Sequence, residues 1–187
     1  MKQLFELDII DSIDISNVKK ILENNTNLWD IDTFRQEAYR VHSKTKSIVL
    51  KWTDNYDYTD IRENADLIQL FEPFITEILT KLDNKFKYKN PHVFKMVFGL
   101  LPSNCTIAKH IDQKKILQLP NRIHIPIITN PDVITYINKN EHYMKEGIIY
   151  NFNNTMSHEV INNSHKDRVH LIIDYYDIDE FNYKCLT

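Results

Sequence analysis

The first half of the chain carries the apolar spacing of amphipathic helices. Residues 17–23 place Val18, Ile21 and Leu22 on one side, and residues 65–82 form a broad apolar stripe. Pro73 lies inside the longer stretch and predicts either a kink or the start of a second helix, because proline has no N–H to donate. Between these helices, residues 47–52 (SIVLKW) predict a β-strand.

From residue 92 onward the pattern changes to short β-rich runs, several of them separated by connections that contain proline. The expected strands are residues 92–101, 106–111, 122–128, 133–137, 147–150, 158–162 and 168–176. Many short strands at this spacing indicate a sandwich or barrel. Helices followed by strands predict an α+β fold. Its core would be a double-stranded β-helix (jelly-roll, cupin-like), with the N-terminal helices packed on one sheet.

Length and composition narrow the class of protein. The 187 residues fit one domain with a sizeable core, and 42% hydrophobic residues are ordinary for a folded globular protein. A formal net charge of −3 argues against a nucleic-acid partner. A cluster of lysines at residues 81–89 is better explained as a solvated helix end and turn.

The location of the protein is also an expectation from sequence. The N-terminal residues lack the basic region and uninterrupted apolar core of a signal peptide, and nowhere do eighteen apolar residues run together. The two cysteines have no metal-finger spacing. We therefore expect a cytoplasmic protein with no membrane partner, and the sequence leaves the oligomeric state open.

One set of residues carries candidate chemistry. His110 and Asp112 are two apart on an expected strand, so their side chains point to the same side. With His158 they can form the facial triad of a non-haem iron(II) oxygenase, which leaves adjacent coordination sites open. Arg168 then offers a docking point for an anionic cosubstrate. Taken singly, each of these residues also has an ordinary explanation as a surface pair, a buried core histidine or a salt-bridge partner.

A second alternating set strengthens the first. In the run RIHIPI, Arg122 and His124 lie on one face of a strand, and Arg168 and His170 do the same in RVHLIID. Such a row is expensive to bury in an apolar core. A dicarboxylate and a metal ion would offset that cost.

At these residues the chain resembles the aspartyl/asparaginyl β-hydroxylase family of iron(II)/2-oxoglutarate oxygenases. The resemblance covers about residues 100–174 and rests on HID, NRIHIPI, EGIIYNFNNTMSHEVINN and RVHLIID. It implies that iron(II) is held by His110, Asp112 and His158. It also implies that Arg168 binds the distal carboxylate of 2-oxoglutarate, and that Arg122 and His124 line the cosubstrate pocket. Where many members carry a tryptophan before the second histidine, this chain has Tyr150, which leaves the pocket wall open to question.

The resemblance implies a dioxygenase that uses O2 and decarboxylates 2-oxoglutarate to succinate while it hydroxylates an amino-acid side chain. The substrate would be a free amino acid or an Asp/Asn-type residue in a peptide or protein. One oxygenase domain would span residues 1–187: residues 1–90 a mostly helical buttress with substrate-side elements, and residues 91–176 the jelly-roll core with the metal and cosubstrate sites. A cupin-like metal-dependent isomerase or hydrolase would not need Arg168, and a non-catalytic jelly-roll binding module would not need the intact triad.

Other polar and aromatic residues give weaker signals. The asparagines at 151, 153 and 154 either orient His158 and touch substrate or form a plain turn. Asp174 either pairs with a neighbouring strand or ends one. The remaining histidines are expected to be surface or structural, and these are His42, His92, His142 and His165. Three further aromatics either line a pocket mouth or pack in the core, with core packing favoured, and these are Trp52, Tyr56 and Tyr58.

Overall fold

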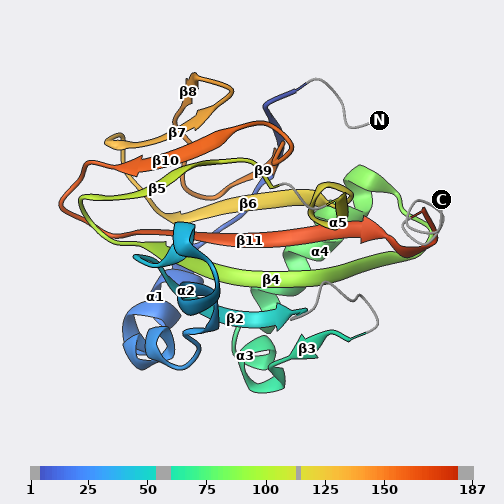
Figure 1. Cartoon of the computed structure of the whole chain (residues 1–187). Helices are drawn as coiled ribbons and strands as arrows, with labels where there is room; N and C mark the ends of the chain where they lie inside the picture. The colour runs from blue at the N-terminus through green and yellow to red at the C-terminus, as the bar shows by residue number, and fades with distance from the viewer. Residues whose placement is uncertain (1–4, 54–59, 113–114, 181–187) are drawn as a thin grey trace.

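Two antiparallel sheets face each other in the computed structural model, which describes residues 5–53, 60–112 and 115–180 (Figure 1). The larger sheet has seven strands in the order β1-β9-β6-β11-β4-β2-β3, and the smaller has four in the order β5-β10-β7-β8. The strands are β1 Leu7–Ser12, β2 Lys46–Trp52, β3 Arg62–Glu63, β4 Pro91–Leu101, β5 Cys105–His110, β6 Asn121–Ile128, β7 Val133–Ile137, β8 Asn140–His142, β9 Ile148–Phe152, β10 His158–Asn162 and β11 Arg168–Asp177. The predicted jelly-roll core is confirmed.

The helices cover the outer face of the seven-stranded sheet, as the sequence predicts (Figure 1). They are α1 Ser16–Asn24, α3 Ala65–Leu70 and α4 Glu72–Phe86, with the short η1 Thr26–Asp30 beside them. Three other short segments carry residues that line the cavity on the inner face, and these are α2 Phe34–Ala38, η2 Arg40–His42 and α5 Lys115–Gln118. Pro73 starts a second helix, because it occupies the first turn of α4, where its missing N–H has no partner to lose. No helix in the described part of the chain is long and apolar enough to cross a membrane.

The main core lies between these helices and the seven-stranded sheet. Phe71 and Ile78 are fully buried from the helix side, and Phe98 and Ile125 are fully buried from β4 and β6. Because side chains alternate along a strand, the next residues on the same strands point the other way, into the space between the two sheets. One face of the large sheet therefore supplies stability, and the opposite face is available for polar chemistry.

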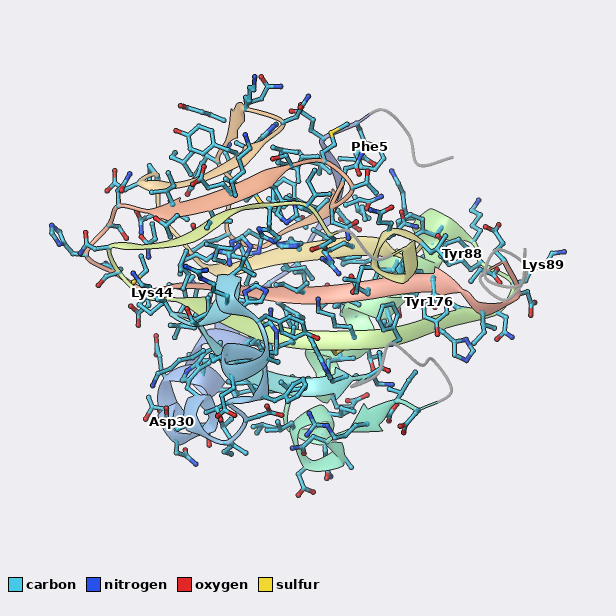
Figure 2. All side chains as sticks on the ribbon, in the orientation of Figure 1. Phe5, Asp30, Lys44, Tyr88, Lys89 and Tyr176 are labelled. Carbon is cyan, nitrogen blue, oxygen red and sulfur yellow. The ribbon has the colours of Figure 1, made fainter. Side chains whose placement is uncertain are left out.

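The lysine run falls where the sequence predicts, at the end of α4 and in the turn after it. Lys81 and Lys85 on α4 pair with Asp11 and Asp8. Lys89 is exposed in the turn before β4 (Figure 2).

The first ninety residues are less helical than expected, because they also supply three strands of the large sheet. β1 pairs with β9 at the sheet edge, and its register shifts between Ile9 and Asp11. This bulge breaks the period-two alternation, so the segment LDIIDS gives no clean strand signal. The short strand β8 and the α5 turn were also missed by the sequence pattern.

Candidate metal centre and its pocket

The three candidate ligands meet at the adjoining ends of two strands. His110 ends β5 and His158 begins β10, and the two residues are register partners in the four-stranded sheet. Their ring centroids lie 4.2 Å apart. Asp112 follows β5, with Oδ1 3.9 Å from His110 Nε2. One ligand atom from each residue lies within 4.8 Å of the others, so small side-chain rotations bring all three onto one ion.

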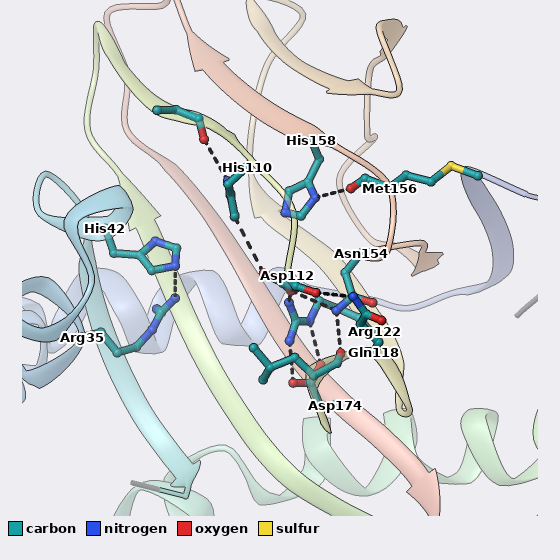
Figure 3. A network of polar contacts seen from close by, with 12 residues as sticks. Arg35, His42, His110, Asp112, Gln118, Arg122, Asn154, Met156, His158 and Asp174 are labelled. Carbon is teal, nitrogen blue, oxygen red and sulfur yellow. Dashed lines mark hydrogen bonds and ion pairs between the residues drawn. The ribbon is translucent and has the colours of Figure 1, made fainter. Parts of the chain in front are cut away.

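Backbone hydrogen bonds decide which nitrogen of each histidine is free (Figure 3). His110 Nδ1 lies 2.8 Å from the carbonyl oxygen of Ala108, and His158 Nδ1 lies 2.9 Å from that of Met156. A carbonyl can only accept, so each Nδ1 carries the proton and each Nε2 keeps its lone pair. Burial and the neighbouring His110 lower the pKa of His158 to about 4, so this ring is neutral near pH 7.

Hydrogen bonds also engage one carboxylate oxygen of Asp112 and leave the other available. Its Oδ2 accepts hydrogen bonds from the guanidinium of Arg122 and from Asn154 Nδ2, the latter at 2.9 Å. Burial would raise the pKa of this carboxyl, but Arg122 and Asn154 outweigh burial and hold it well below its usual range. Oδ1 is therefore left for a metal. Two imidazole nitrogens and one carboxylate oxygen are a donor set that suits non-haem iron(II).

Arg122 is committed to two carboxylates of the protein. Its Nε and one terminal nitrogen donate to Asp174 at 2.7 and 2.8 Å, and its other terminal nitrogen donates to Asp112. Lys95 Nζ lies 3.7 Å from the same Asp174 carboxylate. Asp174 thus pairs with side chains of the strands on either side of it. The structure places Arg122 at the cavity and behind the candidate ligand Asp112, and the cosubstrate-pocket role that the resemblance implies stays a prediction.

Arg168 and His124 lie farther along the face of the large sheet that lines the cavity. Arg168 is 3% exposed, and one terminal nitrogen lies 2.6 Å from His170 Nδ1. Within the described residues no carboxylate forms an ion pair with this guanidinium, and its buried Nε has no hydrogen-bond partner. Burial lowers the pKa of Arg168 to about 9. Burial, followed by the charge of Arg168, also holds the pKa of His124 and of His170 well below the usual value, so both rings are neutral.

All six predicted site residues line one cavity of about 160 Å³ between the sheets. The other lining residues include three polar side chains that the sequence pattern does not place there, and these are Arg35, His42 and Lys95. His42, expected at the surface or in a structural role, has its ring centroid 6.4 Å from that of His110 (Figure 3). Trp52 lies at the cavity and not only in the core, while Tyr56 and Tyr58 fall outside the described residues.

The other polar candidates have local structural partners. His142 contacts Glu6 at 2.9 Å, His92 is half-buried with its ring against Tyr176, and His165 is exposed. Asn153 donates to the carbonyl oxygen of Phe5. Among the three asparagines, Asn154 alone is seen to contact a candidate ligand in the described part of the chain.

Comparison with known proteins adds to this geometry. A family profile described as aspartyl/asparaginyl beta-hydroxylase matches residues 15–177. A search of curated proteins found no matching sequence.

Several solved structures are similar in fold. An oxidoreductase of the 2OG-Fe(II) oxygenase family from Burkholderia pseudomallei has a TM-score of 0.59 at 9% identity, over 82% of this chain and 76% of that one. A prolyl hydroxylase from Trichoplax adhaerens, in complex with a peptide fragment of the hypoxia inducible factor oxygen degradation domain, has a TM-score of 0.59 at 13% identity over 94% and 85%. A Pseudomonas putida prolyl-4-hydroxylase has a TM-score of 0.54 at 9% identity over 93% and 94%. At these identities the likeness shows the fold.

Proposed function

The chain belongs to the aspartyl/asparaginyl β-hydroxylase family of 2-oxoglutarate-dependent oxygenases, and from this premise we propose that it hydroxylates an amino-acid side chain. The substrate is a free amino acid or an Asp/Asn-type residue in a peptide or protein. Hydroxylation is coupled to the oxidative decarboxylation of 2-oxoglutarate to succinate, with O2 as oxidant. The Trichoplax prolyl hydroxylase is in complex with a peptide, which supports testing peptides beside free amino acids. Residues 1–187 act as one oxygenase domain.

The observation that carries the proposal is the set of lone pairs left free at the triad. His110 and His158 each have Nδ1 engaged by a backbone carbonyl, and Asp112 has Oδ2 engaged by Arg122 and Asn154. The remaining Nε2, Nε2 and Oδ1 would hold iron(II). Iron(II) bound there with 2-oxoglutarate supplies the activation of O2 that a C–H hydroxylation requires.

The chain's own residues bind and orient the reactants. Arg168 binds the distal carboxylate of 2-oxoglutarate, because its guanidinium is buried without a counter-anion and its planar fork matches a carboxylate. His124 lines the same part of the pocket as a neutral ring. We assign Arg122 to a positioning role: it anchors Asp112 to Asp174 and keeps Oδ1 turned toward the metal site. The reacting atoms would sit in the cavity of about 160 Å³ that these residues line between the sheets.

A turnover assay tests the proposal. Purified protein is incubated with iron(II), O2, 2-oxoglutarate and a panel of free amino acids and Asp- or Asn-containing peptides. Succinate release and a mass gain of one oxygen atom on the substrate are then measured. We expect both for the wild type, neither for His158→Ala, and unchanged rates for Lys81→Gln, which removes a surface charge on α4. Succinate formation at the same rate in His158→Ala would contradict the proposal.

A further inference from the structure

The pocket holds a second buried arginine that no carboxylate pairs with in the described part of the chain. Arg35 on α2 is 4% exposed and lines the same cavity as the triad. One terminal nitrogen donates to Ser47 Oγ at 2.8 Å, and the other lies 3.2 Å from His42 Nε2. Its buried Nε has no hydrogen-bond partner. A buried arginine without a counter-charge is costly, so its retention at a cavity points to an anionic ligand.

The neighbours of Arg35 are also donors that lack acceptors. A guanidinium can only donate, so His42 Nε2 accepts from Arg35 and the proton of the neutral ring sits on Nδ1. That Nδ1 is buried and has no partner, and the same is true of the indole Nε1 of Trp52. Three unpartnered N–H groups with no unpartnered acceptor among them suit a ligand that offers only acceptors, which a carboxylate does.

The charged side chains around Trp52 also favour an anionic ligand. Arg35 lies over the Trp52 ring at 5.4 Å from its centroid, and Lys95 Nζ lies 5.3 Å from the same centroid. In the described part of the chain Lys95 pairs with Asp174, and both carboxylate oxygens of Asp174 already accept hydrogen bonds from Arg122. The charges of a divalent metal and of 2-oxoglutarate cancel each other. An excess of buried positive charge therefore remains on the Arg35 side after both have bound.

We propose that Arg35, together with His42, Trp52 and Lys95, binds a carboxylate of the primary substrate beside the metal triad. The inference rests on the proposed function and names the chemical group that the enzyme recognises in its substrate. His42 links the subsite to the triad, because its ring packs edge-on against that of His110 (Figure 3). The carboxylate is either the α-carboxylate of a free amino acid or the side-chain carboxylate of a residue in a peptide.

Trp52 provides a direct readout, because it is one of only two tryptophans in the chain and lies against Arg35. The other, Trp29, is buried among the helices and is replaced by Phe in the background used for fluorescence. The protein is loaded with iron(II) and saturating 2-oxoglutarate without O2, so that no turnover occurs. Four probes are titrated: L-aspartate, L-asparagine, N-acetyl-L-aspartic acid α-amide and the neutral N-acetyl-L-asparagine α-amide.

We expect the Trp52 signal to respond to at least one carboxylate probe and not to the neutral one. Arg35→Gln should weaken that binding about 10- to 100-fold, the loss typical of a charge-assisted hydrogen bond. Arg35→Lys should restore part of it, and Lys81→Gln should leave it unchanged. A response to L-asparagine but not to the α-amide of aspartate assigns the α-carboxylate, and the reverse assigns the side-chain carboxylate. Both outcomes support the subsite.

Two outcomes would overturn the inference. One is equal binding of the neutral and carboxylate probes, or no binding of any carboxylate probe; the other is unchanged carboxylate affinity in Arg35→Gln. The binding of 2-oxoglutarate is measured separately by thermal shift. If 2-oxoglutarate binds and the Arg35 dependence is absent, the subsite alone is wrong. If 2-oxoglutarate does not bind the metal-loaded wild type, the proposed function fails, and the carboxylate titration still decides the subsite.

Discussion

Replacing each of two buried arginines by methionine should change stability in opposite directions. Arg168 and Arg122 lie on the neighbouring strands β11 and β6, and both are at least nine-tenths buried. Arg122 is held by Asp174 and Asp112, whereas no carboxylate pairs with Arg168 in the part of the chain that the structure describes. Methionine has a similar reach and no charge, so the pair of variants isolates the effect of the counter-ions.

The magnitude follows from burial. The fall in the pKa of Arg168 from its ordinary value to about 9 corresponds to roughly 5 kcal/mol of cost for keeping the charge buried. Part of this is offset by the hydrogen bond to His170, worth about 1–3 kcal/mol. Arg168→Met should therefore raise the free energy of unfolding of the protein without metal and cosubstrate by about 2–4 kcal/mol. For a chain of this size that is about 4–16 °C in Tm.

The other variant should lose stability. Arg122→Met leaves Asp112 and Asp174 as buried carboxylates without their main partner, which costs about 3–5 kcal/mol.

The Arg168→Met change should also weaken 2-oxoglutarate binding, because two charge-assisted hydrogen bonds worth about 2–4 kcal/mol in total are lost. That is roughly a 30- to 700-fold rise in Kd.

Differential scanning calorimetry and 2-oxoglutarate titration of the metal-loaded protein measure both effects. The reasoning is refuted if Arg168→Met melts below the wild type in the absence of ligand, or if it still binds 2-oxoglutarate with wild-type affinity. It is equally refuted if Arg122→Met gains stability.

Three further predictions concern other parts of the molecule. Asn154→Ala removes one hydrogen bond that fixes Asp112 and should weaken metal affinity about 10- to 100-fold in a chelator competition, with circular dichroism unchanged. Burial, followed by the charge of Arg122, lowers the pKa of Lys95 to about 7, so between about pH 7 and 10.5 the unfolded chain binds the extra proton and stability should rise with pH. Urea unfolding at pH 7 and 9 should show this rise, and Lys95→Met should flatten it; equal slopes in the two proteins would contradict the assignment. Phe71→Ala in the main core should cost about 3–5 kcal/mol without changing metal affinity, whereas Leu70→Ala at a partly exposed site should cost less than about 1 kcal/mol.

The fold was predictable where hydrophobic periodicity is strong. Apart from the short β8, the described strands from β4 onward are separated by turn residues, so their limits lie within two residues of those expected. The β1 edge strand was not predictable, because a bulge removes the alternation that identifies a strand. The start of α4 was one of two alternatives at Pro73, and the tertiary packing of Phe71 and Phe74 decides between them.

The candidate site was predictable mainly where two residues lie two positions apart in an extended segment, and His158 was then predicted as the ligand that completes the triad. His110 and Asp112, or Arg122 and His124, have a spacing that places both on one side. Arg35 and His42 have no such signal, because they come from short helical turns that carry no long period and reach the pocket only through tertiary packing. The partners of Arg122 were equally hidden, since Asp174 faces it from the neighbouring strand fifty-two positions away in sequence.

The orientation of the two triad imidazole rings is fixed by hydrogen bonds to the main chain and not by the side chains around them. Each ring is tied to a carbonyl two positions earlier in its own segment, and the two residues are opposed by ladder pairing. If only this two-stranded segment were transplanted into another antiparallel scaffold, the Nε2 atoms of both histidines would already be oriented toward a common metal position. The oxygen donor would have to be built anew, because its orientation comes from a guanidinium and an amide on other segments.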